Sequence, residues 1–231
     1  MTNQTGKILA QSFSADGNKL VTLSVGDNVL REWDLNSNSR QPTNSWGVPG
    51  KFFAIASSPD QRLWLVAEDG GHALCRDLVG GGGVETNLEL QEISGAAFSP
   101  DGKFFAVASY MGYARVWTNT WREVATLRGY LLGVSSVAFS RDGKRLATGG
   151  ADKEALKLWD TESWQEVLTL DGQGSVFSPT AISPDGNAIG AMNTGGNAGG
   201  AMHIWRAPTW AEINAAEAKE KAGWIGVGAG D

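Results

Sequence analysis

The side chains of this sequence that could carry out chemistry are few and widely spaced. Two acidic pairs, Glu68/Asp69 and Asp152/Glu154, have the residue types that general acid–base catalysis requires. Both pairs fall between β-prone runs, where acidic residues usually form turns. We therefore interpret them as turn residues, and we expect the protein not to be an enzyme.

The histidines, the cysteine and the glycine runs do not indicate a ligand site either. His72 and His203 are distant in the sequence, and neither has further ligand-type residues at metal-binding spacing. Cys75 lies in an apolar β-prone run, which favours a buried thiol over a nucleophile. The glycine runs 80–83 and 195–200 lack the lysine and hydroxyl residue of a phosphate-binding loop. We expect no metal and no cofactor.

The composition excludes several classes of protein. A formal net charge of −6 argues against nucleic-acid binding, because no basic surface is available to neutralise phosphates. No apolar run approaches the roughly 20 residues of a membrane-spanning helix. Residues 1–7 lead into alternating sequence and not into the apolar region of a signal peptide. The expected location is therefore the cytoplasm, with no membrane partner.

One pattern recurs five times along the chain. Its first marker is a turn motif related to Phe-Ser-Pro-Asp-Gly, found at 13–17, 57–61, 98–102, 139–143 and 182–186. Its second marker follows the motif serine by 18 to 22 residues and is Trp33-Asp34, Arg76-Asp77, Trp117-Thr118, Trp159-Asp160 or Trp205-Arg206. The motif serines are 41 to 44 residues apart. A period of this length with two markers in phase is typical of a repeat protein.

Each copy predicts four short β-strands. In the third copy the β-prone runs are 95–99, 103–109, 114–117 and 123–127, separated by turn residues. The Ser-Pro-Asp-Gly element suits a type I turn in which glycine takes the left-handed position. A large apolar residue follows each motif serine by six positions and predicts a core column: Leu20, Trp64, Phe105, Leu146 and Ile189. A single sheet of this kind has two apolar faces, so neighbouring sheets must stack on it.

The fourth copy carries a family resemblance. Its residues 127–130, 137–143 and 156–160 resemble the WD repeat, the unit of the WD-repeat β-propeller. The resemblance covers roughly residues 7–206 and implies an all-β propeller with four-stranded blades. The implied propeller domain is 1–206, with repeats at about 7–48, 51–91, 93–128, 132–171 and 176–206.

Five blades are fewer than the roughly seven that most members of the family have. Two interpretations remain open: a closed five-bladed ring, or an incomplete propeller whose end sheets are covered by another chain or by oligomerisation. The C-terminal tail, 207–231, begins with a capping box formed by Thr209 and Glu212. We predict a helix at 209–222, with an irregular outer strand through 212–216 as the alternative.

The resemblance also implies how each blade is held together. Many WD blades contain an Asp-His-Ser-Trp hydrogen-bond network, and Asp27 matches its aspartate. The histidine position is taken by Tyr130 in the fourth copy, and His72 and His203 fall on the third-strand side. We therefore expect these blades to be held mainly by packing and not by buried polar networks.

Most of the tryptophans recur at two positions of the repeat. The resemblance places four of them in the core between sheets: Trp33, Trp117, Trp159 and Trp205. Three others follow four or five residues later: Trp121, Trp164 and Trp210. Because they recur at one phase, we interpret them as structural residues of the outer rim and not as a ligand site.

A candidate partner-binding surface lies in two loops of the third and fourth copies. Function in this family resides mostly on loops that recognise other proteins. Propeller topology places both of these loops at one end of the disk, and their apolar side chains are Tyr110, Met111, Tyr113, Tyr130, Leu131 and Leu132. Such residues are enriched at interface centres. The alternative is that they fold back and fill the gap between blades.

The sequence thus predicts a non-catalytic, cytoplasmic, bacterial scaffold of the WD-repeat type that binds protein partners, with self-association through the end blades as one option. The tail is similar to that of bacterial WD-repeat proteins, some of which carry a kinase domain. A regulatory or sensor portion of a larger signalling protein is therefore the first alternative. A propeller hydrolase is the second, and it would require a deep central site with several acidic side chains.

Overall fold

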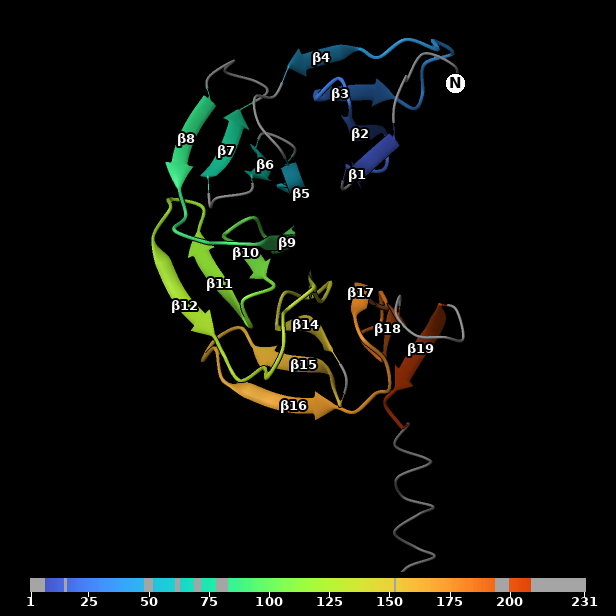
Figure 1. Ribbon diagram of the computed structural model, residues 1–231. Coiled ribbons are helices and arrows are strands. Elements are labelled where there is room, and N and C mark those ends of the chain that lie inside the picture. The colour runs from blue at the N-terminus through green and yellow to red at the C-terminus, as the bar shows by residue number, and fades with distance from the viewer. Residues whose placement is uncertain are drawn as a thin grey trace, which may run out of the picture.

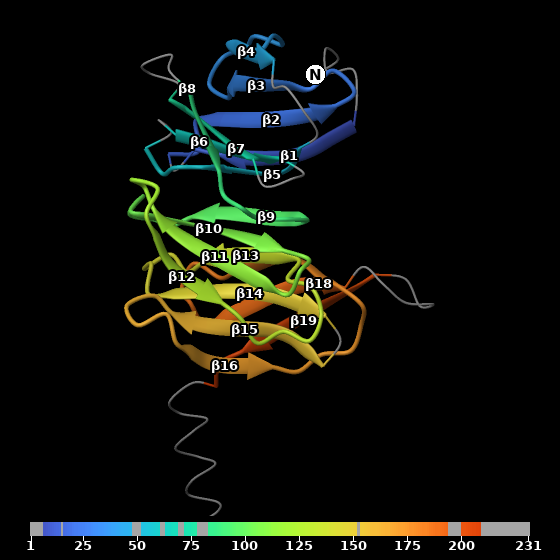
Figure 2. The ribbon, with the colours of Figure 1, turned by 60° about the vertical axis from the view of Figure 1, so that its left-hand side comes forward.

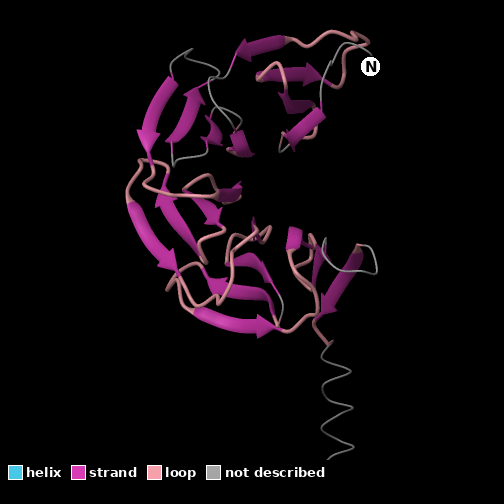
Figure 3. Ribbon diagram, in the orientation of Figure 1, coloured by secondary structure: helices cyan, strands magenta, loops and turns pink. Residues whose placement is uncertain are grey.

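The described part of the chain is entirely β-structure and irregular loops. In the computed structural model of the protein, the described residues are 7–14, 16–47, 52–60, 63–68, 72–77, 83–151, 153–193 and 200–208. They contain nineteen strands and no helix (Figure 3). None of them forms a helix long enough and apolar enough to cross a membrane. The helix predicted at 209–222 lies outside the described residues.

The strands form five antiparallel sheets, each built from consecutive segments of the chain. The first contains β1 (Lys7–Phe13), β2 (Lys19–Val25), β3 (Val29–Asp34) and β4 (Asn44–Gly47). The second contains β5 (Phe52–Ser57), β6 (Leu63–Glu68), β7 (His72–Asp77) and β8 (Gly83–Asn87). The third contains β9 (Ile93–Phe98), β10 (Phe104–Ser109), β11 (Tyr113–Thr118) and β12 (Glu123–Leu127). The fourth contains β13 (Ser136–Phe139), β14 (Arg145–Ala151), β15 (Glu154–Asp160) and β16 (Glu166–Leu170), and the last β17 (Phe177–Ile182), β18 (Ala188–Asn193) and β19 (Ala201–Arg206).

The turn motif has the predicted conformation wherever its glycine is described. Gly17, Gly102, Gly143 and Gly186 have φ between 69° and 74°, the left-handed region that glycine adopts without steric cost. In the fourth sheet Ser140 Oγ donates to Asp142 at 2.6 Å and accepts from the Arg145 amide at 2.9 Å. The serine therefore bridges the turn from inside, which explains why a small hydroxyl residue precedes it.

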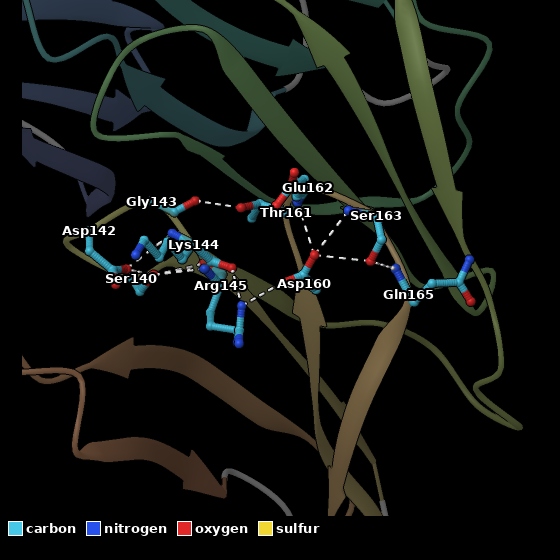
Figure 4. Close-up of polar contacts among 10 residues, drawn as sticks. All are labelled: Ser140, Asp142, Gly143, Lys144, Arg145, Asp160, Thr161, Glu162, Ser163 and Gln165. Carbon is cyan, nitrogen blue, oxygen red and sulfur yellow. Dashed lines mark hydrogen bonds and ion pairs between the residues drawn. The ribbon is translucent and has the colours of Figure 1, made fainter.

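A second set of contacts joins this turn to the turn after the third strand (Figure 4). The Arg145 guanidinium donates to Asp160 Oδ2 at 2.6 Å, and Thr161 Oγ1 donates to the Gly143 carbonyl at 2.7 Å. Asp160 Oδ1 accepts from the Ser163 amide at 2.9 Å. The aspartate of the Trp-Asp marker thus connects two turns at one end of the sheet. The charges of Arg145 and Asp160 therefore have a structural role.

The sheets stack through the predicted core column. The residue six positions after the motif serine pairs with the tryptophan position in every sheet, for example Phe105 with Trp117 and Leu146 with Trp159. Phe105, Leu146 and Ile189 are buried, as predicted. Leu20 is half-buried, and the side chain of Trp64 lies outside the described residues.

The tryptophan predictions hold where the residues are described. Trp33, Trp117 and Trp159 are buried, and Trp205 is half-buried. Trp121 and Trp164 pack edge-on against Phe105 and Phe104, with ring centroids 5.2 and 5.4 Å apart. The two rim tryptophans are therefore structural, as expected from their recurrence. Trp210 lies outside the described residues.

The five sheets follow one another around an arc that does not close (Figures 1 and 2). The first strand of each sheet lies against the first strand of the next, from β1 to β17. Among the described residues, no comparable contact joins the last sheet to the first, and Figure 1 shows the opening between β1–β4 and β17–β19. The described residues therefore form an open arc of sheets and not a closed ring.

Buried hydrogen bonds add to the packing in the first and fourth sheets. The Tyr130 hydroxyl lies 2.7 Å from the Thr148 carbonyl and 2.6 Å from Thr148 Oγ1, which also accepts from Trp159 Nε1 at 2.8 Å. In the first sheet Trp33 Nε1 donates to Thr22 Oγ1 at 2.9 Å. Tyr130 occupies the place of the family's histidine and supplies a hydroxyl of similar reach.

Candidate functional site

The two loops proposed as a binding surface meet in the structure. One joins β10 to β11, and the other joins β12 to β13. A Cβ added to Gly133 would lie 2.7 Å from the Tyr110 carbonyl oxygen, and one added to Gly112 would lie 3.1 Å from the Leu132 carbonyl oxygen. Glycine at both positions therefore permits the close backbone approach that brings the loops together.

Four of the six predicted residues form an exposed surface, which we name the loop patch: Tyr110, Met111, Leu131 and Leu132. Leu131 is 90% exposed, and the other three are 49% to 54% exposed. Tyr113 and Tyr130 are half-buried and fold back against the core, Tyr113 between the second and third sheets and Tyr130 between the third and fourth. The interpretation as an exposed surface thus applies to the four residues of the loop patch, and the interpretation as side chains that fill a gap between blades applies to Tyr113 and Tyr130.

Tyr130 is held in a polar environment beneath the loop patch. Burial raises the pKa of its phenol well above the ordinary value, so the hydroxyl stays protonated and can donate to Thr148. Lys157 Nζ lies 5.3 Å from the centre of the Tyr130 ring and 3.2 Å from a Glu166 oxygen. These contacts hold both the hydroxyl and the ring of Tyr130 in place.

Glu154 connects that environment to the loop patch. One carboxylate oxygen accepts from the Leu131 backbone amide at 2.9 Å, and the other lies 3.5 Å from Lys157 Nζ. A charged acceptor strengthens such a bond relative to a neutral one. The most exposed leucine among the described residues is therefore presented by a fixed backbone.

Tyr113 is covered by two cations. The guanidinium carbons of Arg115 and Arg128 each lie 5.5 Å from its ring centre. Arg128 is exposed, and Arg115 also pairs with Glu123 at 3.4 Å. The loop patch is thus bordered by a positively charged group that can meet an acidic residue of a partner.

The sequence analysis missed these supporting charges, although a signal for them exists. A basic residue stands two positions before the third-strand tryptophan in three sheets: Arg31, Arg115 and Lys157. Each makes an ion pair with a carboxylate on its own sheet. The recurrence of a cation at that position would have identified Arg115 and Lys157.

The side chains considered for catalysis do not come together in the described structure. Glu154 is engaged by the Leu131 amide and by Lys157, and His203 lies against Phe177 and Trp205. No group of three metal-ligating side chains occurs within the described ranges. The side chains of Glu68, Asp69, His72, Cys75 and Asp152 lie outside them.

A hollow of about 430 Å³ lies along β1, β5 and β9, near the turns that follow them. Phe13, Phe98 and Pro59 supply apolar surface, and Ser12 and Ser57 are hydrogen-bonded to each other across it at 2.9 Å. Its lining contains no acidic or basic side chain among the described residues. The hollow therefore lacks the acidic groups that a propeller hydrolase would use.

Comparison with known proteins identifies the repeat. Residues 87–118 and 121–160 match the WD40 family (WD domain, G-beta repeat). Autophagy-related protein 16 of Arabidopsis thaliana is 28% identical over 206 residues, which are 87% of this chain and 39% of that protein. WD repeat-containing protein SL1-17 of Schistosoma mansoni is 28% identical over 165 residues, 67% of this chain and 52% of that protein. Human F-box-like/WD repeat-containing protein TBL1Y is 24% identical over 144 residues, 62% of this chain and 22% of that protein.

The chain is therefore shorter than the proteins it resembles. It spans between about a fifth and about half of the length of these three relatives. The matched residues include strands of the third and fourth sheets, from which the loop patch projects. The repeat match and the candidate surface thus fall on the same part of the molecule.

Proposed function

We propose that this member of the WD40 repeat family is a non-catalytic scaffold that binds a protein partner through the loop patch. The observation that carries the proposal is the exposure of Leu131 at the centre of two loops whose backbone is tightly constrained. WD repeats are generally protein-binding units, which supports this class of function. We place the scaffold in the cytoplasm.

The chemistry of the loop patch suits protein recognition. Tyrosine and methionine are enriched at interface centres, and a polar rim around them is usual. Fully burying a leucine side chain contributes about 1.5 to 3 kcal/mol, so Leu131 can act as an anchor once a partner covers it. Arg128 at the border can pair with an acidic residue and orient the partner.

The rigidity of the site adds to its suitability. The loop is held by the Glu154–Leu131 hydrogen bond and by the contact of Gly133 with Tyr110. An ordered surface loses little conformational entropy on association. A flexible loop with the same residues would bind more weakly.

A test compares two exposed aliphatic residues of the same chain. Leu131→Asp lies in the loop patch, and Val167→Asp lies on the outer strand β16. Proteins captured from a lysate of the source organism by the wild-type chain should be lost at least about tenfold with Leu131→Asp, since burying a charge removes the anchor. Val167→Asp should capture them as the wild type does.

Circular dichroism of both variants serves as the folding control. Tyr113 is not used as the test position because its ring packs under two arginines. Equal capture by Leu131→Asp and the wild type would contradict the proposed site. Loss with both variants would show that the lost capture is not specific to the loop patch and would also contradict the proposed site.

A second candidate is a regulatory portion of a larger signalling protein. It is supported by the greater length of the relatives that this chain matches. Under this proposal the loop patch would contact an effector domain of the same polypeptide. A kinase domain encoded in the same reading frame would support it, and a reading frame with no effector domain would favour the free scaffold.

A further inference from the structure

The last sheet has one strand fewer than the other sheets among the described residues. In the first four sheets the third strand pairs on both sides, for example β15 with β14 and with β16. In the last sheet β19 pairs with β18 on one side, and no described strand pairs with its other side (Figure 1). The edge of β19 therefore offers main-chain N–H and C=O groups to a further strand.

The outer strand of the fourth sheet is less covered than its counterpart in the third. Leu168 of β16 pairs with Leu158, which packs against the core cluster that joins the fourth and fifth sheets. Because paired side chains lie on one face of a sheet, Leu168 lies on the side of the fifth sheet. It is 46% exposed, whereas its counterpart Ala125 is half-buried against the cluster that joins the third and fourth sheets. A fourth strand in the last sheet would lie beside Leu168.

The sequence that follows β19 repeats the sequence that begins β12 and β16. Residues 120–124 are Thr-Trp-Arg-Glu-Val, residues 163–167 are Ser-Trp-Gln-Glu-Val, and residues 209–213 are Thr-Trp-Ala-Glu-Ile. All three stretches have a hydroxyl residue, a tryptophan, a glutamate and a β-branched apolar residue at the same spacing. In both described copies the glutamate is the first residue of the strand. We name residues 212–216, which correspond to the whole of β12 and of β16, the tail segment.

The helix signal in this region also occurs where this chain forms strands. A hydroxyl residue three positions before a glutamate is the capping-box pattern, and it precedes both β12 and β16. There each glutamate pairs with a cation of the third strand of its own sheet: Glu123 with Arg115 at 3.4 Å, and Glu166 with Lys157 at 3.2 Å. The same pattern at 209–212 is therefore as compatible with a strand as with a helix.

Both described copies give the tail segment the same register. The residue before the third-strand tryptophan pairs with the residue two positions after the glutamate: Val116 with Ala125, and Leu158 with Leu168. In the last sheet these two positions are occupied by Ile204 and Asn214. The register therefore predicts that Ile204 and Asn214 lie directly opposite each other in an antiparallel pair.

The last sheet also has a partner for the glutamate of the tail segment. His203 stands two positions before Trp205, where the fourth sheet has Lys157 before its tryptophan. The His203 ring lies against Phe177 and Trp205, with ring centroids 5.2 and 5.7 Å apart. An imidazole N–H can donate to a carboxylate. Glu212 in the predicted register would reach His203 as the glutamate of β16 reaches Lys157.

We propose that the free edge of β19 is a docking site for the tail segment of the same chain, which pairs with it as the fourth strand of the last sheet. Five residues separate β19 from the tail segment, and five also separate β15 from β16, so the connection is long enough. The docked segment covers Leu168 and removes an open edge that would otherwise pair with other molecules. The loop patch takes no part in this contact.

The test is a disulfide trap in the full chain, with Cys75, its single cysteine, changed to serine. Ile204→Cys combined with Asn214→Cys should form an intramolecular disulfide with oxidised glutathione, because opposite Cβ atoms lie about 4.5 to 5.5 Å apart. The matched control combines Ile204→Cys with Ala215→Cys, whose side chain points to the other face of the strand. It should form at least about tenfold less disulfide. Ile204 is 65% exposed, so the change to cysteine should leave the circular dichroism spectrum unchanged.

Hydrogen exchange followed by mass spectrometry gives an independent readout on β19. Asn214→Pro removes an N–H of the tail segment and blocks its pairing with a neighbouring strand. Peptides covering 201–206 should then exchange at least about tenfold faster than in the wild type, and peptides covering β10 should keep the wild-type rate. Exchange of β19 that is the same in both proteins would overturn the proposal.

Three outcomes of the disulfide trap would also overturn it. No disulfide in either pair would place the tail segment away from β19, as the predicted helix would. Equal disulfide in both pairs would show that the segment has no fixed register. A disulfide between two chains would assign the edge to a second molecule. Partner capture through the loop patch is measured separately, so its failure leaves the result for β19 intact.

Discussion

Removing the Tyr130 hydroxyl tests whether the fourth sheet is braced by hydrogen bonds or by packing alone. The change is Tyr130→Phe, which keeps the ring between its neighbours and deletes only the donor. The hydroxyl lies 2.7 Å from the Thr148 carbonyl and 2.6 Å from Thr148 Oγ1. Its loss leaves a half-buried network with one donor fewer, and a hydrogen bond of this kind contributes about 1 kcal/mol.

The expected loss is therefore about 1 to 1.5 kcal/mol of unfolding free energy. In a chain of 231 residues this corresponds to a fall in Tm of roughly 2 to 5 °C. Thr148→Val should cost more, about 1 to 3 kcal/mol, because it orphans the buried indole N–H of Trp159. Valine fits this position sterically, since Val107 holds it in the third sheet.

The assay is thermal unfolding followed by circular dichroism, with both single variants and the double variant. The double-mutant cycle should yield a coupling free energy of about 0.5 to 1.5 kcal/mol between Tyr130 and Thr148, because the two groups share one network. Tyr110→Phe is the control, since its side chain is about half exposed and its loss should stay within about 0.5 kcal/mol. A Tyr130→Phe variant as stable as Tyr110→Phe would refute the reasoning.

Two other substitutions test the fold. Gly150→Ala places a Cβ inside van der Waals contact of the Tyr130 ring and the Glu154 carbonyl, so it should cost about 1 to 3 kcal/mol in thermal unfolding; an unchanged Tm would contradict this packing. The Arg31 hydrogen bond lowers the pKa of Asp27 from 3.8 to about 2, so stability from this pair is complete above pH 3.8 and is lost as the pH falls toward 2. Asp27→Asn should remove that part of the pH dependence, which is about 0.2 to 1 kcal/mol for an exposed ion pair. The measurement is the urea unfolding midpoint of both proteins near pH 2 and above pH 3.8. A midpoint that changes with pH equally in the wild type and in Asp27→Asn would refute the reasoning.

The strand pattern of the third sheet was predictable from the sequence to within two residues at each end. The predicted run 95–99 became 93–98, and 123–127 was found unchanged. Local chemistry is sufficient for this, because the turn motif sets where each strand ends and glycine sets the conformation of the turn. The left-handed Gly102 and Gly143 illustrate that the signal lies within five consecutive residues.

The six candidate side chains of these two loops were also predictable from the sequence, but which of them are exposed and which are half-buried was not. Propeller topology was enough to bring Tyr110 and Leu131 to one end of the molecule. Which side chains face outward depends on the pairing of two loops about twenty residues apart in the sequence. The half-buried position of Tyr130 follows from its bond to Thr148, a contact between a loop and strand β14 that no local pattern encodes.

The sequence alone therefore determined the repeat, the turns, the strands and the columns of core residues, since each depends on residues close together in the chain. The tertiary structure alone decided which polar groups meet and which apolar faces remain uncovered. Met202 illustrates the second kind of information, because its repeat position predicts burial and its exposure reflects the absence of a neighbouring sheet among the described residues. Burial is a property of what stacks on a residue, and the stacking of sheets around an open arc is not contained in any single repeat.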